Sequence, residues 1–323
     1  MKAIRVSGYG DADVLKLTET GPPPAPGAGQ ALVRIHAAGV NFVDIYQRRG
    51  AYPVNLPFIP GLEASGTVEA AGENVTLVRP GDRVSYTGHL GSYSQYTVIE
   101  AEKLIPLPDA MSFEEGAAFP LQGITAHYLI HEFRKPGPGE TVLVHAAAGG
   151  VGRLLVQWAK HLGAVVIGTV SSEEKARVAK EAGADHVVIY TREDFAVQTK
   201  RMTEGRGASL ILDGVGKSTF NGDMDCVSVR GNIVIFGAAS GPADQISPNA
   251  LMPKSISLSG GSSVNFTATR EELLRRANDV LDAIRAGWLK LRMDRVLPLE
   301  KAAQAHRLLE GRQTMGKVIL RTD

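Results

Sequence analysis

A glycine-rich segment between two regular patterns is the part of this chain best suited to binding a charged ligand. It reads His145-Ala146-Ala147-Ala148-Gly149-Gly150-Val151-Gly152. The β-branched run before it, 141–144, predicts a buried strand, and apolar residues at helical spacing after it predict an amphipathic helix. Backbone N–H groups and the positive end of a helix at such a turn bind phosphate. Because Ala147 takes the first glycine position of G-x-G-x-x-G, an ordinary structural turn remains the alternative.

The end of the next predicted strand indicates which dinucleotide would bind. Sites that prefer NAD usually carry Asp or Glu there, about 20 residues after the glycine turn, but this chain has Ser171. Ser171, Ser172 and Lys175 offer hydroxyls and an ammonium group to an adenosine 2′-phosphate. We therefore expect NADPH as the cofactor. Two alternatives remain open. Lys175 could be an ordinary surface lysine, and the carboxylates of Glu173 and Glu174 could repel a phosphate.

The elements that position these residues change in type along the chain. Up to about residue 120, short strands separated by Gly and Pro predict a mostly β unit. From residue 122, strands predicted at 141–146, 165–170, 186–190, 209–213 and 231–237 alternate with helices, which indicates a parallel sheet covered on both faces. A helix after Thr269, a helix over 299–310 and a strand over 317–320 complete the chain.

Composition limits the classes of function. The chain has 323 residues, of which 44% are hydrophobic and 21% charged, as in a soluble protein of two domains. A formal net charge of +1 gives no electrostatic reason to expect nucleic acid or an anionic membrane as the main partner. A single cysteine, Cys226, permits neither an intrachain disulfide nor a thiolate zinc cluster. With no apolar run long enough for a signal or a membrane span, we expect a cytoplasmic location.

Several segments, in the same order, resemble a known family over essentially the whole chain. The chain resembles the zinc-free medium-chain dehydrogenases/reductases, most closely the NADPH:quinone oxidoreductases related to zeta-crystallin. Besides the glycine turn, the segments that carry this resemblance are Ala38-Gly39-Val40-Asn41-Phe42-Val43-Asp44-Ile45-Tyr46, Gln122-Gly123-Ile124-Thr125-Ala126-His127-Tyr128-Leu129, Gly168-Thr169-Val170-Ser171, Glu174-Lys175-Ala176, Val188-Ile189-Tyr190 and Phe236-Gly237-Ala238-Ala239-Ser240-Gly241.

The resemblance implies an α/β fold with two domains. These are a GroES-like, mostly β catalytic domain, residues 1–122 and 265–323, and a Rossmann NADPH-binding domain with a doubly wound parallel sheet, residues 123–264. It also implies a homodimer formed through edge strands of the nucleotide-binding sheets.

The resemblance further assigns cofactor-binding positions. Those for the phosphates and the adenosine half are Ala148, Gly149, Gly150, Val151, Gly152, Ser171, Lys175 and Tyr190. Those near the nicotinamide half are Asn41, Thr125, Phe236, Gly237, Ala238 and Ser240, with Lys317 where the last strand approaches the cofactor.

Zinc-dependent relatives have Cys and His where this chain has Asn41 and Leu62. These residues cannot supply the zinc ligands, so we expect no catalytic metal and no alcohol dehydrogenation. An electron-poor acceptor such as a quinone accepts hydride from the cofactor without a Lewis acid.

The candidate catalytic residues are Asn41, Tyr46 and Tyr52. Asn41 could donate to the cofactor or to an acceptor oxygen, or it could cap a helix. The two tyrosines could line the acceptor pocket or simply pack. His127 and His131 have a spacing that can chelate metal, but the Glu of H-E-x-x-H is absent, so we expect ordinary histidines. We expect His145 to be structural.

The leading prediction is an NADPH-dependent quinone oxidoreductase with a small-molecule acceptor. The first alternative is an NADPH-dependent reductase of activated alkenes such as enones, enals or haloacrylates. A third hypothesis is a non-enzymatic NADPH-binding protein that binds RNA or acts like a crystallin, although the near-neutral charge counts against RNA binding.

Overall fold

The computed structural model describes residues 1–322, which fold into two compact units. The first unit contains residues 1–121, 268–277 and those from 291 onward, and the second contains residues 122–267 and 278–290. The sequence predicts one domain of residues 1–122 and 265–323 and another of residues 123–264, and these boundaries stay a prediction. The observed units differ from them in placing residues 122, 265–267 and 278–290 with the second unit.

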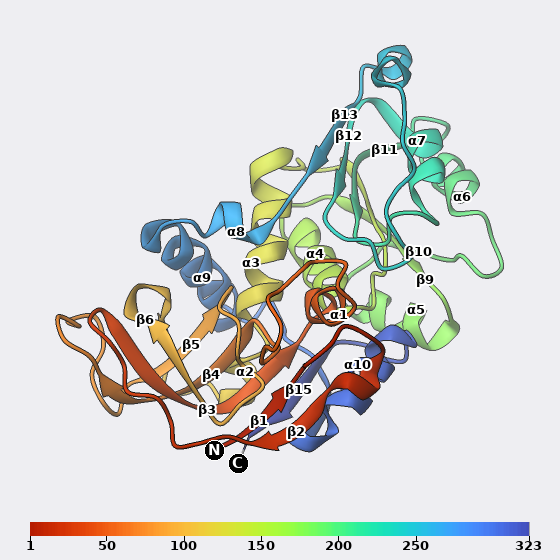
Figure 1. The fold of residues 1–323 in the computed structure, drawn as a ribbon. Helices are drawn as coiled ribbons and strands as arrows, with labels where there is room; N and C mark the ends of the chain where they lie inside the picture. The colour runs from red at the N-terminus through yellow and green to blue at the C-terminus, as the bar shows by residue number, and fades with distance from the viewer. Residues whose placement is uncertain (323) are drawn as a thin grey trace. The chain divides into compact units, whose positions relative to one another are not determined.

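The first unit is built on a seven-stranded sheet (Figure 1). Its strand order is β14-β15-β3-β4-β5-β7, with β6 paired to β3, and every pair except β14–β15 is antiparallel. β1 and β2 form a separate two-stranded sheet. The strands are β1 (Lys2–Arg5), β2 (Lys16–Glu19), β3 (Gln30–Val40), β4 (Glu63–Ala71), β5 (Arg83–Thr87), β6 (Tyr96–Glu100), β7 (Ile105–Pro106), β14 (Met293–Pro298) and β15 (Lys317–Arg321).

Short helices and apolar side chains complete the first unit. The helices are α1 (Phe42–Arg48), α2 (Phe113–Gly116) and α10 (Ala302–Glu310), with single 3-10 turns at Ala12–Val14, Ala101–Lys103 and Leu299–Lys301. One core cluster joins side chains from β3, β4 and α10, among them Val33, Val68 and Ala305. The prediction of a mostly β unit before residue 120 is confirmed.

Strand register in the first unit brings distant residues together. β3 pairs with β4 on one side and with β15 on the other. The end of β3 therefore lies beside the beginnings of β4 and β15, which places Asn41, Glu63 and Lys317 at neighbouring positions. A side chain on Gly39 would occupy this space, because its Cβ would lie 2.4 Å from the Glu63 carboxylate and 2.6 Å from Cε of Lys317.

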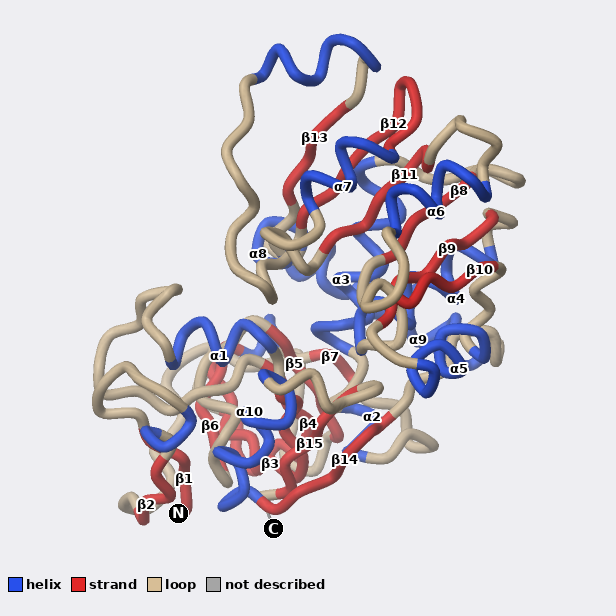
Figure 2. The backbone as a smooth tube through the Cα atoms, turned by 90° about the vertical axis from the view of Figure 1, so that its right-hand side faces the viewer, coloured by secondary structure: helices blue, strands red, loops and turns tan. Residues whose placement is uncertain are grey.

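The second unit contains a six-stranded sheet in which every pair of neighbours is parallel, with the strand order β10-β9-β8-β11-β12-β13. This order is that of a doubly wound dinucleotide-binding fold, so the predicted fold class is confirmed. Figure 2 shows these strands lying side by side. They are β8 (Thr141–Val144), β9 (Val165–Val170), β10 (His186–Ile189), β11 (Ala208–Asp213), β12 (Val227–Ile235) and β13 (Ser257–Gly260). The sequence analysis missed β13, a short and polar end strand, and placed the start of β12 too late.

Helices cover both faces of the parallel sheet, as its side chains require. Leu143, Ile167 and Ile211 belong to one apolar cluster, and the residues before and after them on each strand point to the opposite face and are also buried. The helices are α3 (Pro120–Tyr128), α4 (Gly150–His161), α5 (Glu173–Glu181), α6 (Phe195–Met202), α7 (Phe220–Cys226), α8 (Ser263–Phe266) and α9 (Arg270–Arg285), with a π-helix at Leu129–Phe133 and a 3-10 segment at Pro248–Lys254.

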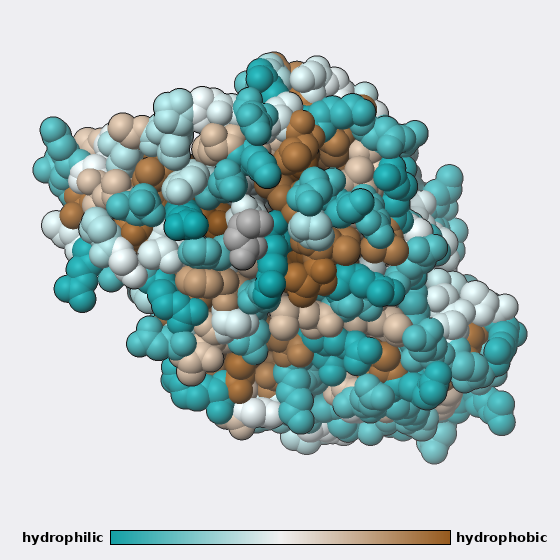
Figure 3. Space-filling view, turned by 90° about the horizontal axis from the view of Figure 1, so that it is seen from below, coloured by the Kyte–Doolittle hydropathy of each residue, from teal (hydrophilic) through white to brown (hydrophobic). Residues whose placement is uncertain are grey.

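The surface of the molecule is of mixed polarity. The face drawn in Figure 3 carries many hydrophilic side chains interspersed with smaller hydrophobic areas. Among residues 1–322, no helix is both long enough and apolar enough to cross a membrane.

Candidate functional site

The glycine turn of the second unit leaves a helix N-terminus without a side-chain cap. The turn follows β8, and α4 begins at Gly150 with Gly149 at its N-cap position, where no side chain accepts a hydrogen bond. Ala146 adopts a left-handed conformation with φ of 50°, and the N–H of Gly149 donates to its carbonyl at 2.7 Å. The N–H groups of the first turn of α4 have no partner within the helix, so they are suited to bind an anion.

Close backbone approaches explain why glycine occupies this turn. A Cβ on Gly152 would lie 2.3 Å from the carbonyl oxygen of Ala146, which belongs to the backbone and cannot move aside. A Cβ on Gly150 would lie 2.3 Å from the side-chain amide of Gln122. Glycine at 152 is thus required for α4 to begin so close to the end of β8, whereas Ala147 needs no such freedom.

The residues predicted to hold the adenosine phosphate follow two neighbouring strands. Ser171 follows β9 and Tyr190 follows β10, and the last residues of these strands are paired in parallel register. Lys175 lies half-buried in the first turn of α5, and its N–H donates to Oγ of Ser172, the N-cap residue, at 3.3 Å. The structure thus brings Ser171, Lys175 and Tyr190 to one edge of the sheet. The Ser172 oxygen caps α5 as an acceptor, which leaves its O–H able to donate.

An acidic side chain beside this edge already has a cationic partner. The carboxylate of Glu173 lies 2.5 Å from the guanidinium of Arg192, and both side chains are exposed. Arg192 therefore offsets part of the negative charge that would otherwise oppose a phosphate here.

The segment 236–241, predicted to lie near the nicotinamide, is held by the turn that follows β11. Phe236 donates its N–H to the carbonyl of Asp213 at 2.9 Å. The Ser240 hydroxyl donates to the carbonyl of Val215 at 2.8 Å and accepts the Ser218 N–H at 3.0 Å. The Ser240 hydroxyl thus ties two loops together. Gly237 and Ala238 lie in the same segment, while Thr125 lies buried on α3.

The first unit contains a buried cluster of three polar side chains. The Lys317 ammonium donates to Oδ1 of Asn41 at 2.7 Å and to the carboxylate of Glu63, and Nδ2 of Asn41 donates to Oε2 of Glu63 at 3.0 Å. The other Glu63 oxygen accepts the N–H of Leu121 at 2.6 Å. Lys317 and Glu63 are no more than 1% exposed. Because the charges are paired and hydrogen-bonded, the cluster can persist away from water.

Asn41 both caps α1 and belongs to this cluster. It is the N-cap residue of α1, and its own N–H donates to Oδ2 of Asp44 at 2.8 Å. The same Asp44 oxygen accepts the Tyr93 hydroxyl at 2.9 Å. The sequence left open whether Asn41 caps a helix or donates to the cofactor or an acceptor oxygen. The structure places it at the N-cap position with its amide bonded to Glu63 and Lys317, and a contact with cofactor or acceptor stays a prediction.

Further buried groups continue from Tyr93 to the surface. The Tyr93 hydroxyl lies 3.1 Å from Nε2 of His306, and Nδ1 of His306 lies 3.2 Å from Nη1 of Arg48. Arg48 makes two hydrogen bonds to the Glu310 carboxylate, at 2.6 and 3.1 Å. Since burial, with the Arg48 charge adding to it, lowers the pKa of His306 to about 3, His306 is neutral near pH 7.

The two candidate tyrosines contact each other. The ring centroids of Tyr46 and Tyr52 lie 5.2 Å apart in an edge-on arrangement. Tyr46 is on α1 and half-buried, while Tyr52 is 53% exposed. A pair of partly exposed rings next to the Asn41 cap provides a surface on which a flat acceptor can stack.

The sequence also singled out His127, His131 and Cys226, whose side chains are buried or half-buried. His127 lies 2.9 Å from the carboxylate of Asp279, and burial lowers the pKa of the adjacent His131 to about 4, with His127 adding to the shift. Burial raises the pKa of Cys226 to about 12, so the thiol is protonated, as expected of an inert small hydrophobe. Within residues 1–322, no group of three or more His, Cys, Asp or Glu side chains is placed to hold a metal ion.

Comparisons with known proteins agree with this arrangement of units. The family model described as the alcohol dehydrogenase GroES-like domain matches residues 27–109, and the model described as zinc-binding dehydrogenase matches residues 150–279. A quinone oxidoreductase of Pseudomonas aeruginosa is 41% identical over 322 residues, which cover 99% of each chain.

The chain belongs to the quinone oxidoreductase family of zinc-free medium-chain dehydrogenases/reductases. A 2-haloacrylate reductase from Burkholderia is 39% identical over 92% of each chain. The structure of the Escherichia coli quinone oxidoreductase complexed with NADPH superimposes with a TM-score of 0.96 at 38% identity, covering 99% of this chain and 100% of the other. The family is one of oxidoreductase enzymes, and the predicted recognition and fold are confirmed.

The sequence analysis missed the partners of Asn41. It named Asn41 and Lys317 separately and did not connect either to Glu63 or Asp44. Asp44 carries a local signal, since Asn41-x-x-Asp44 has the spacing of a capping box. The Glu63 contact carries no such signal, because it depends on the register of β3 against β4.

Titration of Asp44 gives a prediction about stability. Burial raises the pKa of Asp44 from 3.8 to about 7, despite the hydrogen bonds from Asn41 and Tyr93 that lower it. Because the folded state binds this proton more tightly than the unfolded state, stability from Asp44 is present below about pH 4 and is lost as the pH rises through 7. Asp44→Asn should therefore make the free energy of unfolding fall less steeply between these pH values.

Urea denaturation of the wild type and Asp44→Asn at a series of pH values measures this difference. The Asp109→Asn variant, which changes an exposed carboxylate of the same unit, is the matched control. Parallel stability–pH curves for the wild type and Asp44→Asn would contradict a raised pKa at Asp44.

Proposed function

We propose that this protein is an NADPH-dependent quinone oxidoreductase that works without zinc. The observation that carries the proposal is the edge of the parallel sheet. There an uncapped helix N-terminus follows β8, while Ser171 rather than a carboxylate follows β9. The first feature suits a pyrophosphate, and the second suits an adenosine 2′-phosphate. The NADPH complex of the Escherichia coli relative supports the same cofactor here.

The residues present fit this cofactor. The turn 148–152 offers backbone N–H groups to the pyrophosphate, and Ser171, Lys175 and Tyr190 offer a hydroxyl, an ammonium group and a ring to the adenosine end. Phe236, Gly237, Ala238 and Ser240 would hold the nicotinamide end. Bound NADPH supplies a hydride. The protein's part is to orient the ring and keep water from it.

We assign the acceptor to the first unit, at the Tyr46–Tyr52 pair. A quinone is flat and apolar, and its carbonyl oxygens gain negative charge as hydride is added. The tyrosine rings can stack on such a molecule. The Asn41 amide is committed to Glu63 and Lys317, so we assign it the role of fixing the start of α1, which carries Tyr46.

Reduction of an activated alkene is the second candidate function. The observation that favours it is the similarity to the 2-haloacrylate reductase, which is nearly as high as the similarity to the quinone oxidoreductase. Both reactions need the same hydride donor. They differ because an alkene also needs a proton at its α-carbon.

The test of the proposed function is NADPH oxidation by the purified protein with a panel of quinones, enones, enals and haloacrylates. Deuterated NADPH shows whether label enters a carbon of the alkene products. We expect turnover with quinones and little with alkenes. Turnover with alkenes alone, with deuterium at the β-carbon, would replace the first function by the second, and no turnover with any acceptor would contradict both.

Lys175→Ala tests the preference for NADPH. Loss of a charge-assisted contact with the 2′-phosphate should weaken NADPH binding by about 1–3 kcal/mol and leave NADH binding unchanged. Titration calorimetry with both nucleotides measures the two affinities. Lys180→Ala, which removes an exposed lysine from the last turn of the same helix, is the control. Equal losses for NADPH and NADH would remove Lys175 from the phosphate site.

We also propose a homodimer formed through β13. This strand ends the parallel sheet, and an end strand presents unpaired backbone groups that a second copy can pair with. Exposed apolar side chains support the proposal, since Leu258 lies on β13 while Met252 and Val229 lie in neighbouring segments and are 70% and 68% exposed.

Sedimentation velocity tests the dimer. The wild type should sediment with twice the mass of one chain, and Leu258→Lys should shift it to the monomer because burying a lysine at the interface is costly. Val197→Lys, at an exposed position on α6, should leave the dimer intact. A wild type that stays monomeric at all concentrations would contradict the proposal.

A further inference from the structure

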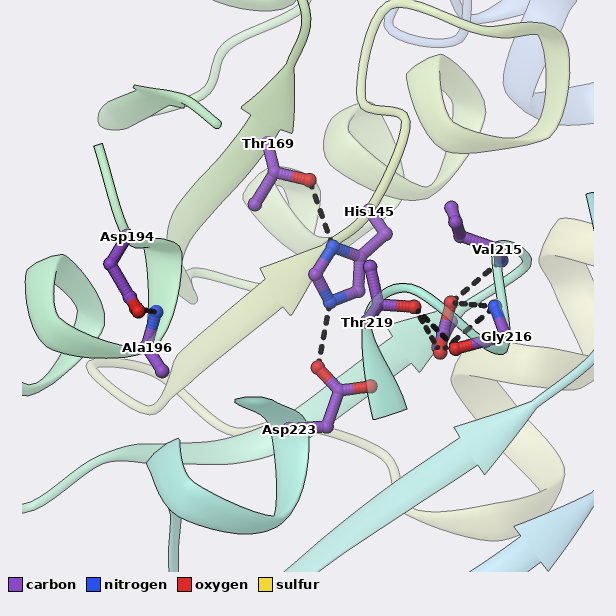
Figure 4. Close-up of polar contacts among 9 residues, drawn as sticks. His145, Thr169, Asp194, Ala196, Val215, Gly216, Thr219 and Asp223 are labelled. Atoms are coloured by element: carbon purple, nitrogen blue, oxygen red, sulfur yellow. Dashed lines mark hydrogen bonds and ion pairs between the residues drawn. The ribbon is translucent and has the colours of Figure 1, made fainter. Parts of the chain in front are cut away.

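Four polar residues lie buried beneath the edge of the parallel sheet where the cofactor would bind. They are His145, Thr169, Asp213 and Asp223, and none is more than 2% exposed. Figure 4 shows the His145 ring between Thr169 and Asp223. We refer to these four residues as the strand-end cluster. The proposed reaction makes no direct use of it.

The His145 ring joins three elements. Nδ1 lies 2.8 Å from Oγ1 of Thr169 at the end of β9, and Nε2 lies 2.7 Å from Oδ1 of Asp223 on α7. The edge of the ring packs on Phe195 of α6 at 4.8 Å between centroids. One side chain that follows β8 is thus fixed to a neighbouring strand and to two helices.

The cluster also reaches two of the loops to which the cofactor is assigned. His145 is the first residue of the glycine-rich segment, and the carbonyl of Thr169 accepts the N–H of Ala147 within that segment at 3.1 Å. Oδ1 of Asp213 accepts the N–H groups of Val215 and Gly216 at 2.6 and 3.1 Å. The turn that Asp213 shapes in this way is the one that holds the segment 236–241.

Both nitrogens of the His145 ring have a polar partner. Burial alone would lower the pKa of His145, but Asp223, with Asp213 adding to it, outweighs burial and raises that pKa above its usual value. The Asp223 carboxylate can accept the Nε2–H, and the Thr169 hydroxyl can either accept from Nδ1 or donate to it, so both bonds persist in either protonation state of the ring.

Stability alone does not explain such a cluster. Burying charges costs solvation energy, and well-packed apolar residues can often replace a buried ion pair without loss of stability. Oδ2 of Asp223 has no hydrogen-bond partner among the described residues, which adds to the cost. The benefit of fixed hydrogen bonds is geometric, because they hold separate strand ends at one relative position.

We propose that His145, held between Asp223 and Thr169, is a positioning residue for NADPH. It fixes the glycine turn relative to the end of β9, while Asp213 fixes the turn that carries the segment 236–241. The two ends of one dinucleotide are thereby bound by loops that share a single buried anchor. This inference rests on the proposed use of NADPH.

The experiment compares the full-length wild type with Thr169→Val, Thr169→Ser and Asp223→Asn. Thr169→Val keeps the shape of the side chain but removes the hydroxyl, whereas Thr169→Ser retains it. We expect NADPH to bind about tenfold more weakly to Thr169→Val and Asp223→Asn, and Thr169→Ser to bind within roughly twofold of the wild type. The kcat at saturating NADPH should change little, because the affected step is binding. His186→Gln, at the exposed amino end of β10, is the control.

Nitrogen-15 NMR of the histidine rings gives a second measurement that does not depend on NADPH. At pH 7.5 Nε2 of the His145 ring should carry a proton in the wild type. The Nδ1 shift should change in Thr169→Val and stay in Thr169→Ser, because only the first variant loses the hydroxyl. If Asp223→Asn does not fold, Thr169→Val and the wild-type spectrum decide the question.

The possible failures are distinguishable. A wild-type His145 whose Nε2 carries no proton overturns the proposal, as does unchanged NADPH affinity in a folded Thr169→Val variant, and in both cases the proposed function stands. If the folded wild type binds no NADPH, the proposed function fails together with the positioning role.

Discussion

The close approach between Gly152 and the carbonyl of Ala146 is the constraint on which the rest of the second unit depends. It lets α4 begin directly beyond the end of β8, so that the uncapped N–H groups of the helix face the place at the sheet edge where a phosphate would lie. The parallel register of β8 with β9 and β11 then carries Ser171 and Asp213 to the same edge. A side chain larger than hydrogen at 152 would displace the helix and with it this arrangement.

Each unit uses buried charge at strand ends to fix its functional residues. In the first unit, Lys317 and Glu63 hold Asn41 at the start of α1, and in the second, His145 and Asp223 hold the end of β8. Both pairs are costly to bury and are retained where strand ends must keep one geometry.

Local patterns made much of this structure predictable. The glycine turn, the alternation of strands with helices after residue 122 and the polar strand end at Ser171 are all short-range features, and they predicted the parallel sheet and its functional edge. Contacts that depend on register were not predictable. The Asn41–Glu63–Lys317 cluster joins three strands far apart in the sequence. The alternation of side chains along β8 places His145 on the same face as the buried Leu143, so its burial was predictable from the sequence. Its contact with Asp223 was not, because Asp223 lies on a helix far along the chain.

The central claim is that the sheet edge at Ser171 accepts an adenosine 2′-phosphate. The most direct measurement is a calorimetric titration of the purified wild-type protein with NADPH and, separately, with NADH. The account predicts tight, saturable binding of NADPH and clearly weaker binding of NADH. Binding of neither nucleotide, or binding of NADH as tight as that of NADPH, would contradict it.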